Sequence, residues 1–173
     1  MARLTNLTDR GRETQVQLRD VLMALILEKG YDRVSIKDIT ERAQVDRSTF
    51  YLHFRDKDDL FVKSQRWMVD ELLALRSQGR GPYPGITVTF EHMARNPRLY
   101  LAIWQAEGLA SHAGSFEDYI ATTLAGVLEG MLRERGIGAE GLLEPLSRYL
   151  AGALRSLARW WLETGMATSP AEM

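Results

Sequence analysis

Residues 35–57 read SIKDITERAQVDRSTFYLHFRDK, and this stretch decides the fold of the 173-residue chain. Ser35 is suited to cap a helix, with Asp38 three residues later, where its carboxylate can reach back to the cap. Three apolar residues then recur at helical spacing on one face: Ile36, Ile39 and Ala43. The pattern predicts a short helix with one buried side.

A second short helix is expected after the turn Gln44-Val45-Asp46. Asp46 can cap this helix, and Thr49 occupies its third position. Phe50 and Phe54 are spaced i, i+4, so both rings are expected to face the core. The predicted helix runs from Arg47 to His53, and its polar side chains are left to project outward or to its flanks: Arg47, Ser48, Thr49, Tyr51 and His53.

These outward side chains suit a nucleic acid. A helix fits the major groove of B-DNA, where the base edges carry a distinct pattern of donors and acceptors. Arg47 can bind guanine in bidentate fashion, and Ser48 and Thr49 can bond to base edges or phosphates. Tyr51 and His53 can donate to phosphate oxygens, which fix the register without reading the sequence.

A third helix is expected to begin near Asp56, with Asp59 at its third position as a second capping pair. Lys57 lies in its first turn, where backbone N–H groups already favour an anion. This combination predicts a phosphate clamp. From the residues alone, a second interpretation stays open: a solvated pair of surface helices in which Tyr51 packs and His53 is a surface or capping residue.

The stretch from about Gln15 to Leu60 resembles the DNA-binding domain of the TetR family of bacterial transcription regulators. The matching residues are Val16–Leu27, Gly30-Tyr31-Asp32, Val34–Ile39, Ala43, Val45, Ser48-Thr49-Phe50-Tyr51, His53-Phe54 and Lys57–Leu60. The resemblance implies that Arg47–His53 is the recognition helix. It also implies that the phosphate backbone is contacted by Ser35, Tyr51, His53 and Lys57.

Gln44 departs from the family pattern, which usually has glycine inside the turn. Glycine adopts a left-handed backbone without a clash of Cβ. A glutamine in that conformation costs roughly 1–2 kcal/mol. Either the turn absorbs this cost or its geometry shifts slightly, so the resemblance does not fix the angle of the recognition helix.

Composition narrows the class of protein further. The chain has no cysteine, which excludes a disulfide framework and a thiolate metal site. Its start lacks the apolar region of a signal peptide, and no run of about 18 apolar residues occurs, so the expectation is a soluble, cytoplasmic protein without a membrane partner. The net charge is −1, with 11 Lys and Arg against 9 Asp and Glu in residues 1–57 and 11 against 14 beyond them. DNA affinity must then come from the local placement of Arg47, Lys57 and a terminal arm that contains Arg3, Arg10 and Arg12. The arm is expected to be disordered. By the resemblance, its arginines touch DNA.

The rest of the chain also reads as helices, without strand-like alternation. Helices are predicted over about 57–76, 86–94 and 97–107, and two long helices over about 115–136 and 142–163. Ser115 and Asp118 are expected to cap the first of the long pair. The predicted fold is therefore all-α: a three-helix helix-turn-helix DNA-binding domain over residues 1–57, and a helical bundle for dimerisation and ligand binding over residues 58–173.

The last long helix carries an apolar stripe at helical spacing, wide enough for a second surface. The stripe contains Leu146, Leu150, Ala153, Leu154, Leu157 and Trp161, and Tyr149, Gly152 and Trp160 widen it. Burial of both sides within a monomer is one explanation. The resemblance implies the other, a homodimer in which the last two long helices form a four-helix interface. Such a dimer would place two recognition helices on a palindromic operator in double-stranded DNA.

The resemblance also implies a small-molecule pocket in the C-terminal helices. Aromatic and methionine side chains are the candidates for its lining: Trp67, Phe90, Met93, Tyr100, Trp104, Phe116 and Tyr119. Such a lining favours a hydrophobic or aromatic effector, although residues of this kind at helical spacing also form plain cores. The region is short for the family, so a small pocket or none is also compatible with it.

Enzyme function is not expected. His53, His92 and His112 lack the spacing of metal ligands, no glycine-rich phosphate loop follows a strand, and no cofactor or metal is predicted. The leading hypothesis is a homodimeric, sequence-specific repressor released by a small effector. The alternatives are a helical protein-interaction module without specific DNA binding, and a transcriptional activator.

Overall fold

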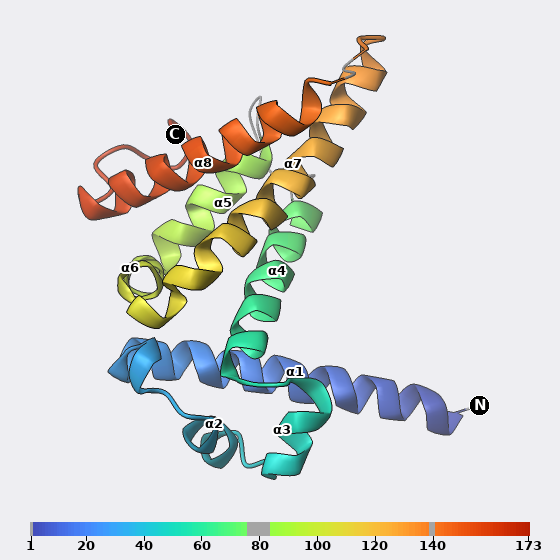
Figure 1. The fold of residues 1–173 in the computed structure, drawn as a ribbon, viewed down its shortest axis with the longest axis vertical. Helices are drawn as coiled ribbons and strands as arrows, with labels where there is room; N and C mark the ends of the chain where they lie inside the picture. Colours follow the sequence, from blue (N-terminus) through green and yellow to red (C-terminus); the bar gives the residue numbers. More distant parts are fainter. Residues whose placement is uncertain (1, 76–83, 139–140) are drawn as a thin grey trace. The chain divides into compact units, whose positions relative to one another are not determined.

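The computed structural model describes residues 2–75, 84–138 and 141–173, and every regular element in these ranges is helical (Figure 1). The prediction of an all-α fold is confirmed. In chain order the α-helices and the two short 3-10 helices (η) are α1 Ala2–Lys29, η1 Tyr31–Arg33, α2 Ile36–Arg42, α3 Arg47–His53, α4 Lys57–Leu75, α5 Pro84–Arg95, α6 Pro97–Gln105, η3 Glu107–His112, α7 Ala113–Glu134 and α8 Leu143–Glu163.

The chain forms two compact units that alternate along the sequence. The first unit contains residues 1–67 and 98–110, and the second contains residues 68–97 and 111–173. The contacts therefore divide the chain differently from the expected boundary after Lys57. Helix α6 and the start of η3 belong with the N-terminal helices.

The first unit is built on one apolar core. Helix α1 contributes Leu18, Leu22, Leu25 and Ile26, and the segments after it supply the remaining buried residues: Tyr31, Val34, Ile39, Ala43, Phe50, Phe54, Leu60, Phe61 and Leu109. The predicted inward pair is confirmed, because Phe50 and Phe54 are both buried and their ring centroids lie 5.7 Å apart. Burial of these two rings fixes which side of α3 faces outward.

Local signals position α2 as the sequence predicts. The Asp38 N–H donates to Ser35 Oγ at 3.2 Å, and the Ser35 N–H donates to Asp38 Oδ2 at 2.8 Å, which completes a capping box. Lys29 Nζ lies 2.8 Å from the same carboxylate oxygen. The Lys29 ammonium and the bonds from Ser35 hold the pKa of the Asp38 carboxyl well below its usual range.

The turn between α2 and α3 contains a residue with a left-handed backbone. Gln44 has φ 53°, as predicted from the glycine that the family usually has at this position. A Cβ is unfavourable in this conformation, by roughly 1–2 kcal/mol. Two backbone hydrogen bonds stabilise the turn: Val45 N–H donates to Thr40 O at 3.1 Å, and Gln44 N–H donates to Glu41 O at 3.2 Å.

Gln44→Gly is expected to raise the free energy of unfolding by about 0.5–1 kcal/mol. Removal of the Cβ relieves the left-handed strain, and the added freedom of the unfolded glycine offsets part of this gain. Urea unfolding followed by circular dichroism measures the difference. Arg66→Gly within α4 is the matched control and should lower stability by about 1 kcal/mol. An unchanged or lower midpoint for Gln44→Gly contradicts strain at the turn.

A close backbone approach attaches residues 98–110 to the rest of the first unit. The Gly108 N–H donates to Asp32 Oδ1 at 2.9 Å. A Cβ at Gly108 would lie 2.4 Å from that oxygen, so only glycine allows this hydrogen bond without a displacement of Asp32. The next residue, Leu109, is buried in the same core.

The second unit contains the two longest C-terminal helices. Helices α7 and α8 pack along each other and are linked by two ion pairs, Arg148 Nη1 to Asp118 Oδ1 at 2.6 Å and Arg155 Nε to Glu117 Oε2 at 2.9 Å. The prediction that Ser115 caps α7 is wrong. Helix η3 runs directly into α7, which begins at Ala113, so no side-chain cap is needed where Ser115 lies.

Candidate DNA-binding interface

Helix α3 presents a mixed outer surface on a buried support. Its backbone begins after Asp46, which is extended at φ −68° and ψ 149° and makes no side-chain capping bond. Arg47, Ser48 and Tyr51 are exposed, whereas Thr49 and His53 are half-buried. All five predicted contact residues of α3 therefore reach its surface to some degree.

Arg47 and Tyr51 form one ridge of this surface. They are spaced i, i+4, and Arg47 Nη2 donates to Tyr51 Oη at 3.0 Å. The guanidinium carbon lies 5.6 Å from the Tyr51 ring centroid. The Tyr51 ring in turn meets Phe50 edge-on, at 5.5 Å and 89°. The buried phenylalanine thus supports a tyrosine that orients the arginine.

His53 connects α3 to α1. Gln15 Nε2 lies 3.3 Å from His53 Nδ1. With the amide as the donor, the neutral ring carries its proton on Nε2, which leaves one N–H for a phosphate oxygen. A second tie from α1 lies nearby, where Gln17 Nε2 donates to Ala43 O at 2.9 Å. Helix α1 therefore contacts the C-terminal end of α2 and the C-terminal end of α3.

Lys57 has partners within the protein that the sequence did not suggest. Its Nζ donates to Tyr31 O and to Val34 O, each at 2.9 Å, and lies 4.0 Å from the Tyr31 ring centroid. Burial lowers the pKa of the Lys57 ammonium. The Tyr31 hydroxyl donates to Asp58, and burial together with that carboxylate raises the pKa of Tyr31. One of the three Lys57 protons remains for a phosphate.

The structure places Ser35 next to this lysine. Ser35 follows Val34, whose carbonyl accepts from Lys57, and its own hydroxyl donates to Asp38 Oδ2 at 2.6 Å. Ser35 and Lys57 thus meet at the start of α2. Both already have hydrogen-bond partners, so their role in phosphate binding stays a prediction.

Sequence reasoning missed two exposed residues beside the predicted set. Leu52, the last residue but one of α3, is 81% exposed. Arg55, in the turn before α4, has a side chain that is 85% exposed. The inward pairing of Phe50 and Phe54 was the available signal, because it leaves no place in the core for Leu52.

The terminal arm differs from the expectation of disorder. Helix α1 extends back to Ala2, so this segment continues the helix. Arg10 and Arg12 are exposed on it. The side chain of Arg3 lies outside the described side chains.

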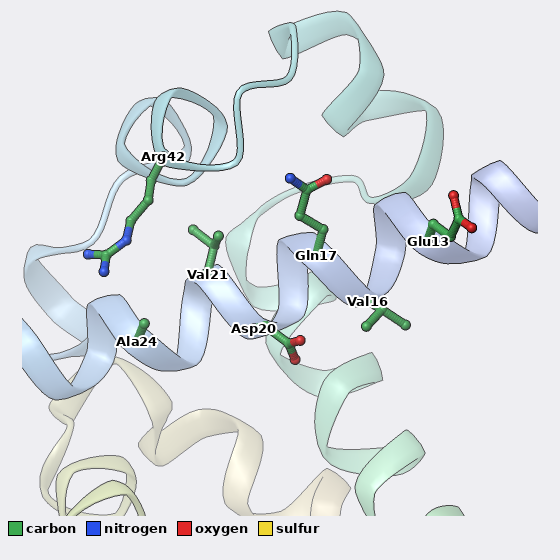
Figure 2. A pocket seen from close by; sticks show the side chains of 7 residues that line it. All are labelled: Glu13, Val16, Gln17, Asp20, Val21, Ala24 and Arg42. Carbon is green, nitrogen blue, oxygen red and sulfur yellow. The ribbon is translucent and has the colours of Figure 1, made fainter.

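An open groove runs beside α1 (Figure 2). In Figure 2, Gln17 and Val21 extend from α1 toward the side where α2 lies, and Arg42 extends from α2 toward α1, whereas Val16 and Asp20 point away from α2. Arg42 Nη1 is paired with Glu28 Oε2 at 2.5 Å. The groove is shallow and mixed in charge, and it contains none of the seven predicted ligand-binding residues. Its lining is Glu13, Val16, Gln17, Asp20, Val21, Ala24 and Arg42.

The predicted ligand-binding residues divide between the two units. Trp67, Tyr100 and Trp104 belong to the first unit, where Trp67 meets Phe54 edge-on at 6.2 Å. The others belong to the second unit: Phe90, Met93, Phe116 and Tyr119. Phe90 is buried against Trp161 at 5.1 Å, and Tyr119 Oη donates to Asp70 Oδ1 at 2.5 Å. Their role as a pocket lining stays a prediction.

The apolar stripe of α8 is shifted from the predicted one. Trp161 is 1% exposed, and its Nε1–H donates to Thr168 O at 2.7 Å, so it forms part of the core and its assignment to the interface is wrong. Leu150 and Leu154 are half-buried. Exposed side chains follow each other three or four residues apart along the outer side: Leu142, Leu146, Tyr149, Ala153, Leu157 and Trp160.

The fold and the exposed α3 surface define a helix-turn-helix DNA-binding protein, and comparison with known proteins gives its family. Residues 18–63 match "Bacterial regulatory proteins, tetR family", and residues 81–173 match "Transcriptional regulator C-terminal region". The chain belongs to the TetR family of DNA-binding transcriptional regulators. The regulators of this family are transcription factors and not enzymes, in agreement with the sequence-based expectation.

Individual relatives agree with this assignment. The chain is 33% identical over 87 residues to the HTH-type transcriptional regulator AcrR of Shigella flexneri, a match that covers 49% of this chain and 39% of that protein. The match thus spans about two-fifths of the relative's length. A TetR-family regulator from Syntrophomonas wolfei has the same fold, with TM-score 0.68, 20% identity, and 93% of this chain and 89% of that chain covered.

Another solved structure with the same fold is the Thermus thermophilus repressor FadR in complex with lauroyl-CoA. Its TM-score is 0.60 and its identity 22%, with 91% of this chain and 88% of that chain covered.

Within the described residues, no helix of this protein combines the length and apolar character needed to cross a membrane.

Proposed function

We propose that the chain is a homodimeric repressor that binds a palindromic operator in double-stranded DNA and is released by a small hydrophobic or aromatic effector. In this division of labour residues 1–57 bind DNA, and residues 58–173 supply dimerisation and effector response. The observation that carries the proposal is the exposed surface of α3. There Arg47 donates a hydrogen bond to Tyr51, and the Tyr51 ring packs edge-on against the buried Phe50.

Base reading is assigned to Arg47, Ser48 and Thr49. Arginine binds the O6 and N7 atoms of guanine in bidentate fashion, and the contact with Tyr51 limits the rotamers that Arg47 must give up on binding. Phosphate binding is assigned to Tyr51 and His53, together with Ser35 and Lys57 at the start of α2. The exposed Arg55 extends this set.

The outer side of α8 supports a dimer. Tyr149 is 72% exposed and Trp160 is 53% exposed. Contiguous apolar surface of this kind on a soluble protein marks an interaction site. The three- and four-residue spacing suits packing against a second helix of the same kind. A two-fold pair of subunits then presents two α3 helices, and the operator repeats its half-site about one helical turn away.

The effector is assigned to the helical region beyond Lys57. Its aromatic and methionine side chains favour an apolar ligand over a charged one. The repressor FadR, which shares the fold, was solved with lauroyl-CoA. The apolar acyl chain of lauroyl-CoA, which is joined to a charged CoA group, makes this compound a reasonable first probe, beside lauric acid and simple aromatic compounds.

One experiment separates the parts of the proposal. The full-length protein is used to select duplexes from a random DNA pool, and the selected site is compared with the DNA that flanks its own gene. The expected result is a palindromic site bound by two chains, with affinity that falls steeply as salt rises. Folded protein that enriches no sequence at low salt would overturn the proposed operator binding.

The sign of regulation is tested separately. Transcription in vitro from a promoter that contains the selected site should fall when the protein is added, and addition of the effector should restore it. A rise in transcription assigns the same interface to an activator. If neither the acyl compounds nor the aromatic compounds weaken DNA binding, the proposed effector class is contradicted while the DNA-binding part stands.

A further inference from the structure

We propose that Leu52 determines specificity by packing on the C5-methyl group of a thymine in the operator. This inference rests on the proposed reading of DNA by α3. It assigns a chemical target to the exposed leucine of that helix, which carries no polar group of its own.

The exposure of Leu52 has no explanation in the protein's own core. At 81% it is the most exposed of the large apolar residues in the described part of the chain. Phe50 and Phe54 on the same segment are already buried and supply the attachment of α3 to the core. A single exposed leucine on an ordinary surface needs no account. Here, however, it lies on the surface that enters the DNA.

The position of Leu52 on α3 places it beside Ser48, a polar residue proposed to contact bases. Ser48 and Leu52 are spaced i, i+4 and form a second ridge beside Arg47 and Tyr51. Arg47 and Leu52 are five residues apart, about 7.5 Å along the helix axis. This separation corresponds to roughly two base-pair steps of 3.4 Å. The side chains of Arg47 and Leu52 are therefore expected to contact different base pairs.

The major groove contains one apolar feature that matches a leucine. Thymine presents a C5-methyl group there, whereas guanine, adenine and cytosine present only donors and acceptors at their edges. Contact removes both the methyl group and the leucine from water, which is favourable in proportion to the apolar area buried. A cytosine at that position has a hydrogen in place of the methyl group, so the leucine loses this apolar contact.

The test replaces thymine by deoxyuridine, which pairs identically and lacks only the methyl group. Each symmetric pair of thymines in the selected operator is replaced in turn, and the affinity of the full-length dimer is measured. At one pair of positions the affinity should fall roughly fourfold for each half-site, or about fifteenfold for both, as expected for one methyl group buried in each.

Leu52→Ala should weaken binding to the thymine operator and remove the difference between thymine and deoxyuridine at that position. Leu52→Met, which keeps an apolar side chain of similar volume, should retain it. Leu27→Ala is the matched control, because Leu27 is an exposed leucine of α1 in the same unit. It should leave both the affinity and the methyl effect unchanged.

Substitution with 5-methylcytosine at the same position separates the methyl group from the rest of thymine. It should bind more tightly than cytosine in the wild type and equally in Leu52→Ala. The inference is overturned if no thymine shows a methyl effect, or if Leu52→Ala keeps the full effect. Absence of any selected operator would instead contradict the proposed function, so the two failures are distinguishable.

Discussion

Tyr149→Asp combined with Trp160→Asp is expected to convert the protein into monomers. The two rings are the largest exposed apolar groups on the outer side of α8, at 72% and 53% exposure. Loss of an aromatic contact at the centre of an interface costs about 2 kcal/mol or more. Each substitution occurs in both subunits of a two-fold dimer, so the dimer dissociation constant should rise at least roughly a thousandfold.

The same double variant should bind the operator at least roughly a hundredfold more weakly, because the α3 helices of the two subunits are no longer linked. Analytical ultracentrifugation measures the first effect, and fluorescence anisotropy with the selected duplex measures the second. Arg159→Asp is the control, since it also introduces an aspartate on the exposed surface of α8 but off the apolar stripe. A folded double variant that remains dimeric shows that the interface lies elsewhere.

Arg47→Ala is expected to weaken operator binding by about 1–3 kcal/mol, or roughly 5- to 150-fold, and to relax the base preference at one position of each half-site. The loss arises from a bidentate contact to guanine that alanine cannot make. Selection from a random pool with the variant should give a motif that is degenerate at that position. An unchanged motif refutes base reading by Arg47.

Tyr51→Phe separates orientation of the arginine from base reading itself. The hydroxyl that accepts from Arg47 Nη2 is lost, while the ring remains against Phe50. Binding should weaken by less than in Arg47→Ala, and the selected motif should keep its guanine. Arg133→Ala is the control for a lost arginine, because that side chain lies in α7 of the other unit and is 75% exposed.

Short-range signals in the sequence predicted the reading head well. Ser35 and Asp38 form the expected capping box, Phe50 and Phe54 face inward, and α3 spans the predicted residues Arg47–His53. The left-handed Gln44 was also predictable, because its position in the turn demands that conformation. These features depend on residues three or four apart, which sequence reading resolves directly.

Features that depend on distant residues were not predictable. The contacts of Lys57 join residues 23 and 26 positions apart, so its role as a bridge to Tyr31 and Val34 has no local pattern. The wrong assignment of Trp161 has the same cause. Helical spacing shows that α8 is apolar on two sides, but contacts with other segments, among them those of Trp161 with Phe90 and Thr168, decide which side is covered within the chain.

The hydrogen bond between Asp32 and Gly108 joins residues 76 positions apart, and Leu109 fills the core beside it. During synthesis the N-terminal helices are therefore made before the leucine that completes their core. In the chain, that leucine comes after the whole of α5 and α6. A fragment that stops after α4 lacks this leucine, so native packing of the DNA-reading head depends on more than half of the chain.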